Sequence, residues 1–219
     1  ANLAALTGFS GQWIDCVHGR RSLRSIVLDM DSSVSPTHGE QEGTAYNGHF
    51  ACTCYHPLFV FNQFGDLERC AQRCALRPGN VHSADGWKDV LEPVVERYRG
   101  KVSYLRFRAD AAFANPDVYE YLEAQGIKYA IRLPAIRILQ DRIGYLLKRP
   151  VGRPPHHVRR HYANFRYRAA SWGTSRRVVA KVEWHPGELY PRVGFIVTNM
   201  SRPAERVVAF HNKRGPCDQ

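Results

Sequence analysis

Ser25-Ile26-Val27-Leu28-Asp29-Met30-Asp31 is the stretch that decides the predicted fold class. It is a short apolar run that ends in acidic residues, the pattern of a buried strand that delivers carboxylates to its carboxyl end. The polar, Gly-containing residues 32–48 that follow predict a loop. A strand buried in this way belongs to a sheet that helices cover, so we expect an α/β protein.

The segments that follow, as far as residue 133, alternate between strand and helix patterns. Residues 50–62 and 67–76 are rich in β-forming residues and are separated by a short Gly-containing turn, which predicts a hairpin. Apolar spacing then predicts a helix, a strand, a helix and a strand at 83–98, 102–107, 116–125 and 127–133. The order β-β-β-α-β-α-β is that of an RNase H-like core.

The excess positive charge of the chain is concentrated in residues 132–177. This segment holds 12 Lys and Arg against one acid, whereas the whole chain has 31 basic and 20 acidic residues. A basic block of this kind attracts phosphate backbones through counterion release. A solvated basic face without a partner is the alternative. As DNA-contacting candidates within the block we take Arg153, Arg159, Arg160, Arg166 and Arg168.

Three aspartates have a placement that suits metal chemistry. Asp31 ends the first predicted strand, Asp110 follows the strand at 102–107, and Asp218 follows the last predicted helix. Carboxylates that gather from strand ends can hold two divalent ions, which activate water and stabilise a leaving oxygen. Carboxylate oxygens are the ligands that Mg²⁺ prefers. Acids at strand ends are also common as caps and turn formers, so spacing alone leaves both interpretations open.

The predicted fold is therefore an RNase H-like mixed-sheet core with a β-rich insertion between the second and third of these acids. Strand-like stretches at 161–171, 177–184 and 193–198 make up the insertion, and a helix resumes near residue 203. We expect four parts: an N-terminal flank, the first part of the core, the basic β-rich insertion and the start of a returning core helix, at 1–24, 25–133, 134–200 and 201–219.

Composition predicts a folded, cytoplasmic protein. Hydrophobic residues make up 44% of the chain, no stretch approaches 18 apolar residues, and the N-terminal residues lack the pattern of a secretion signal. The six cysteines are therefore expected to be reduced thiols. A zinc site remains an alternative, and its ligands would be His49, Cys52, Cys54 and His56.

Several short motifs are spread along nearly the whole chain. The first is Leu28-Asp29-Met30-Asp31-Ser32-Ser33. The others are PTHGEQEG at 36–43, YNG at 46–48, YHPL at 55–58, LRPGN at 76–80, RAD at 108–110 with Phe113, and LPA at 133–135. Together they resemble the motifs of the DDE transposases of bacterial insertion sequences, specifically the family numbered thirteen-eighty.

The resemblance assigns roles to these residues. Asp31 and Asp110 match the first two catalytic acids, and Asp29, which shares a strand face with Asp31, is a lesser candidate. Related transposases carry Tyr, two residues, Arg, three residues and Glu on the final helix. This spacing is kept here by His211, Arg214 and Asp218. His211, Lys213 and Arg214 are then expected to contact phosphate.

The resemblance also implies an activity and its requirements. It implies hydrolysis at transposon ends and transfer of the freed 3′-hydroxyl into target DNA, with two Mg²⁺ or Mn²⁺ ions. The partners would be double-stranded DNA, as terminal inverted repeats and target, and a second copy of the full-length chain. The protein would work at the bacterial nucleoid and not at a membrane. The alternative is a catalytically inactive remnant, truncated at both ends, that only binds DNA through residues 132–177.

Overall fold

The chain forms two units, which are described separately. In the computed structural model the first unit is Ala1–Phe113 with Gly215–Gln219, and the second is Ala114–Arg214. The structure describes residues 2–19, 23–39, 41–70, 77–149, 151–152 and 156–214.

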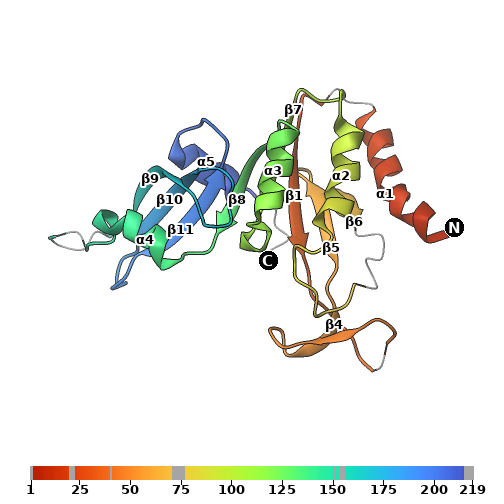
Figure 1. Ribbon diagram of the computed structural model, residues 1–219, viewed down its shortest axis with the longest axis horizontal. Helices are drawn as coiled ribbons and strands as arrows, with labels where there is room; N and C mark the ends of the chain where they lie inside the picture. The colour runs from red at the N-terminus through yellow and green to blue at the C-terminus, as the bar shows by residue number, and fades with distance from the viewer. Residues whose placement is uncertain are drawn as a thin grey trace. The chain divides into compact units, whose positions relative to one another are not determined.

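Four strands form the centre of the first unit (Figure 1). Their order is β6-β5-β1-β7, and their bounds are Leu67–Cys70, Leu58–Asn62, Ser25–Ser32 and Tyr104–Ala109. β1 pairs in parallel with β7 and antiparallel with β5, so the strand arrangement is mixed. Ile26, Leu28 and Met30 of β1 are buried, which explains why this apolar run forms the central strand. The predicted mixed α/β class is confirmed, whereas the insertion between the acids stays a prediction.

Two helices pack against these strands. α1 (Asn2–His18) contacts β6, and α2 (Trp87–Tyr98) contacts β5 and β6. The sequence pattern did not predict α1, which contains two glycines, Gly8 and Gly11, that disfavour a helix. Gly11 allows a close approach, because a Cβ atom there would lie 2.1 Å from Nη2 of Arg97. Tertiary packing therefore stabilises a helix that local preference does not.

The expected hairpin forms between β5 and β6, but a small separate sheet takes up the first part of the strand predicted at 50–62. Its strands are β2, β4 and β3 in spatial order, with bounds Ser35–Pro36, Cys52–Tyr55 and Ala45–Asn47. The prediction of a loop at 32–48 and of one strand at 50–62 is wrong in this respect. The break falls at Pro57, which has no backbone N–H to donate and ends the pairing of β4 before β5 begins. Figure 1 shows the small sheet beyond the carboxyl end of β1, from which the chain enters it.

The second unit is built on four antiparallel strands. Their order is β8-β11-β10-β9, with bounds Lys128–Leu133, Arg192–Thr198, Arg176–Trp184 and Arg159–Tyr167. The helical elements of this unit are α3 (Pro116–Ala124), α4 (Arg137–Arg142), the 3₁₀ turn η2 (Gly144–Leu146) and α5 (Ala204–His211). The strands lie within two residues of the starts predicted for them.

α5 packs on one face of this unit. Val207 and Val208 of α5 join Ala130, Val179 and Ile196 of the strands in one buried cluster. α3 contacts β8. No helix in the described part of the chain is both long and apolar enough to cross a lipid bilayer.

Candidate active site

Asp31 and Asp110 lie at the carboxyl ends of neighbouring parallel strands in the first unit. In the pairing of β1 with β7, Asp29 is opposite Arg108 and Met30 is opposite Ala109. One further step in this register brings Asp31 beside Asp110, the residue that follows β7. Alternation along β1 places Asp31 on the same face as Asp29. Two acids 79 positions apart in the chain are thereby brought to one edge of the sheet.

Backbone amides orient both carboxylates. The N–H of Ser32 donates to Oδ1 of Asp31 over 2.9 Å, and the N–H of Ala112 donates to Oδ1 of Asp110 over 3.0 Å. The second bond belongs to the 3₁₀ turn η1 (Ala111–Phe113), which begins directly after Asp110. Both aspartates are half-buried. Each carboxylate is therefore held in a set direction while it stays accessible from solvent.

A buried ion pair lies one register step inward from these acids. Nε and Nη2 of Arg108 donate to Oδ1 and Oδ2 of Asp29, over 2.6 and 2.5 Å. Arg108 is 3% exposed and Asp29 is 7% exposed. The two-point contact neutralises two charges that would otherwise be costly to bury. Asp29, the lesser candidate for catalysis, thus has its carboxylate engaged by Arg108.

No role was predicted for Arg108 from the sequence. The signal that could have found it is a shared spacing: a charged residue stands two positions before the candidate acid on both strands, as Asp29 before Asp31 and as Arg108 before Asp110. On parallel neighbours in register, these two residues face each other. The pairing of opposite charges follows from that.

Other predicted site residues lie elsewhere. Asp218 and Arg153 fall outside the described residues. His211 is the last residue of α5 in the second unit, and the N–H of Arg214 donates to the carbonyl of His211 over 3.1 Å. Lys213 is exposed between them. The predicted phosphate contacts at positions 211, 213 and 214 thus lie within one turn of chain.

Three of the four described arginines predicted to bind DNA within the basic segment are engaged by groups of their own unit. The Nε atom of Arg160 donates to Glu183 over 2.9 Å, that of Arg166 to the hydroxyl of Ser175 over 3.0 Å, and that of Arg168 to the carbonyl of Trp172 over 3.1 Å. The fourth, Arg159, is the first residue of β9. These contacts occupy donors that a phosphate would need.

The residues considered for zinc lie in or beside the small sheet and do not gather as a metal site. Burial raises the pKa of the Cys54 thiol, and a hydrogen bond with Cys52 adds to this. Burial lowers the pKa of His56, whose Nδ1 lies 3.3 Å from the carbonyl of Val81. Among the residues that the structure describes, no three His, Cys, Asp or Glu side chains cluster as a metal would require.

The comparisons with known proteins identify one family. A family model described as transposase DDE domain group 1 matches residues 1–219, which is the whole chain. No curated protein matches the sequence.

Proposed function

Because the chain belongs to the group 1 family of transposase DDE domains, we propose that Asp31 and Asp110 carry the DNA cleavage and strand transfer that such domains perform in transposition. The observation that supports this most directly is the register of β1 and β7, which brings the two acids together at one sheet edge. Asp218 would be the third acid, on the basis of its spacing from Arg214.

The two aspartates suit divalent ions. Their hard oxygen donors match Mg²⁺ or Mn²⁺, and two such ions would be held by Asp31, Asp110 and Asp218. When bound, the ions would activate a water nucleophile and neutralise charge on the leaving 3′ oxygen.

The protein's own groups prepare the site for that chemistry. The amides of Ser32 and Ala112 fix the carboxylate directions before any ion binds, so less reorganisation is needed during the reaction. The Asp29–Arg108 pair keeps the charge beneath the acids balanced. Arg108 thereby acts as a positioning residue for the strand that carries Asp110.

The finer assignments follow the sequence resemblance. The substrates would be double-stranded terminal inverted repeats of an insertion sequence of the family numbered thirteen-eighty, and target DNA. A dimer of the full-length protein would hold paired ends at the bacterial nucleoid, in the cytoplasm. His211, Lys213 and Arg214 would contact phosphate near the third acid. The fold would be an RNase H-like core with the basic β-rich segment at 134–200 as its insertion.

A strand-cleavage assay on labelled terminal-repeat DNA with Mg²⁺ or Mn²⁺ tests the catalytic assignment. We expect Asp110→Asn to lose cleavage by at least about a hundredfold, because even a 1 Å misplacement of a catalytic group costs about that much. Asp89→Asn is the matched control, since Asp89 is an exposed acid on α2 of the same unit. Cleavage by Asp110→Asn at the wild-type rate would refute the assignment.

The same assay separates the enzyme from the alternative of a DNA-binding remnant. DNA binding is measured in EDTA and cleavage is measured with metal, on the same protein and the same DNA. Wild-type protein that binds in EDTA but never cleaves with either metal is the remnant. Metal-dependent cleavage that requires Asp110 supports the enzyme.

A further inference from the structure

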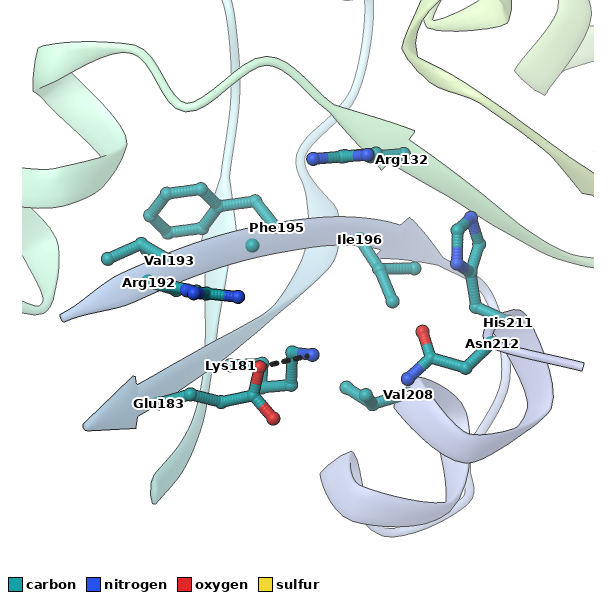
Figure 2. Close-up of a pocket in the computed structure, with 11 residues that line it drawn as sticks. Arg132, Lys181, Glu183, Arg192, Val193, Phe195, Ile196, Val208, His211 and Asn212 are labelled. Atoms are coloured by element: carbon teal, nitrogen blue, oxygen red, sulfur yellow. Dashed lines mark ion pairs between the residues drawn. The ribbon is translucent and has the colours of Figure 1, made fainter. Parts of the chain in front are cut away.

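An open pocket lies on one face of the strands of the second unit. Its volume is about 260 Å³. Figure 2 shows Arg132 reaching over it from β8, Lys181 and Arg192 along its floor, and His211 beside Asn212 at the end of α5. None of the four described candidates Arg159, Arg160, Arg166 and Arg168 lines this pocket, whereas Arg132, the first cation of the basic segment, and His211 do.

The pocket exists because α5 covers only part of the face. The positions under α5 carry Ala130, Val179 and Ile196, which are buried with it. One step along each strand the same face carries Arg132, Lys181 and Gly194, which α5 does not cover. The uncovered part of the face is therefore polar and open.

Gly194 shapes the floor of this pocket. A Cβ atom built at Gly194 would meet nothing within 4 Å, so the space above its backbone is empty. Gly194 is not among the glycines with a left-handed backbone, so the strand geometry does not require a glycine here. The missing side chain leaves room for a ligand between the surrounding cations.

The electrostatics of the pocket favour an anion. Glu183 accepts from Lys181 and Arg160, both over 2.9 Å, and Arg192 donates to Glu188 over 3.1 Å. Burial raises the pKa of Glu183, but the bonds from Lys181 and Arg160 outweigh this and lower it, so the carboxylate stays charged. The lining and its rim still hold more cations than carboxylates: Arg132, Arg160, Lys181 and Arg192 against Glu183 and Glu188.

Arg132 is the cation with donors to offer. Among the residues that the structure describes, none forms a hydrogen bond or ion pair with its guanidinium. A guanidinium presents donors in a planar fork that matches two phosphate oxygens. The positive face around Arg132 can therefore hold a phosphate at two points.

We propose that this pocket binds a phosphodiester group of the DNA backbone, with Arg132 as the principal contact. The choice of DNA rests on the proposed function. Lys181 and Arg192 line the same open pocket, so a strand can pass through it with successive phosphates near successive cations. Arg166 and Arg168, two of the contacts that the sequence predicted, are not among the lining residues, whereas His211, another of them, is.

Fluorescence anisotropy with a labelled DNA duplex, in EDTA and over a range of salt concentrations, tests the assignment. We expect Arg132→Gln to weaken binding about three- to tenfold at low salt, because a charge-assisted hydrogen bond is lost. The slope of log affinity against log salt should fall by about 0.9, the value for one phosphate contact. Lys128→Gln is the matched control: Lys128 is an exposed cation on the same strand and face, four residues away.

A second variant tests the pocket without removing a charge. Gly194→Leu fills the open space above the strand and should weaken DNA binding at least as much as Arg132→Gln. Thermal unfolding checks that the variant is folded. If Gly194→Leu does not fold, Arg132→Gln still decides the test, because Arg132 is exposed and its replacement should not disturb folding. DNA binding by Arg132→Gln that equals that of Lys128→Gln would overturn the proposal, as would wild-type binding by folded Gly194→Leu.

Competition experiments identify the source of the phosphate. A deoxynucleoside monophosphate and inorganic phosphate are titrated into wild type and Gly194→Leu. A mononucleotide that binds only wild type, while both proteins bind DNA equally, would overturn the proposal in favour of a nucleotide site. If wild type binds no DNA at all, the proposed function fails with it. DNA binding that the pocket variants leave unchanged refutes only the pocket.

Discussion

In the first unit the candidate functional groups gather at the ends of parallel strands, whereas in the second they lie along the face of antiparallel strands. β1 and β7 run in the same direction, so their carboxyl ends share one edge and deliver Asp31 and Asp110 together. β10 and β11 run in opposite directions, so their carboxyl ends lie at opposite edges of the sheet. In the second unit, residues from different strands meet only across a face, as Lys181 and Gly194 do.

The two units also differ in how they neutralise charge. The first buries the Asp29–Arg108 pair and also the Glu68 carboxylate that Arg97 binds, and it leaves Asp31 and Asp110 half-exposed. The second spreads many cations and engages several of them locally. Arg176 is bound by Glu123, and Arg177 donates to the carbonyls of Met200 and Arg202. Local charge density therefore overstates the number of cations that a DNA phosphate can use.

The largest expected effect concerns the buried pair of the first unit. Arg108→Met leaves the Asp29 carboxylate buried without its partner, and we expect the free energy of unfolding to fall by about 3–5 kcal/mol. The double variant Asp29→Leu with Arg108→Met removes both charges and should recover most of that loss. Urea denaturation of wild type, single and double variants measures this. A double variant no more stable than Arg108→Met would show that the pair does not act as a unit.

The fold of the first unit was predictable where local pattern and tertiary structure agree. The apolar run at β1 and its acidic end specify a buried strand whatever surrounds it. α1 was not predictable, since its glycines oppose a helix and its stability comes from packing on β6. The missing backbone donor of Pro57 could have predicted the break, but the content of β-forming residues at 50–62 favoured one continuous strand.

The site was predictable to a lesser extent. The direction of the strands alone predicts that Asp31 and Asp110 lie near each other, because the carboxyl ends of neighbouring parallel strands share one edge of the sheet. The Asp29–Arg108 contact needs the register as well, which a single sequence does not fix. The carboxylates that bind the arginines are harder to predict, because they are distant in the sequence. Glu183 lies 23 residues from Arg160, and Glu123 lies 53 residues from Arg176. Such long-range ion pairs decide which cations can still bind a DNA phosphate.

A smaller effect is expected from the buried arginine of the second unit. Arg176 is 4% exposed in its side chain and donates to both oxygens of Glu123, which is 34% exposed and also accepts from Tyr129. Burial raises the pKa of Glu123, but the bonds from Arg176 and Tyr129 outweigh this and lower it. Glu123→Gln should therefore cost about 1–3 kcal/mol at neutral pH, less than Arg108→Met.

The same variant gives a pH dependence with a defined sign. A carboxyl whose pKa is lower in the folded state stabilises the protein above its ordinary pKa and loses that contribution as pH falls through the lowered value. Wild type should thus lose stability below about pH 4.3, the ordinary value for Glu. Thermal unfolding from pH 7 to pH 3 should show the gap between wild type and Glu123→Gln closing with acid. A gap that stays constant would mean that Glu123 is not ionised in the folded protein.

The smallest expected effect separates charge density from available donors within the second unit. Arg166 is exposed on β9, but its guanidinium already donates to the side chain and carbonyl of Ser175. Arg166→Gln should therefore change the salt slope of DNA binding by less than half of the roughly 0.9 expected for Arg132→Gln. Anisotropy on the same duplex compares the two variants directly. A fall of about 0.9 in the salt slope for Arg166→Gln, with no fall for Arg132→Gln, would support the DNA contacts that the sequence predicted on β9. It would also show that an intramolecular bond to Ser175 is exchanged for a phosphate at little cost.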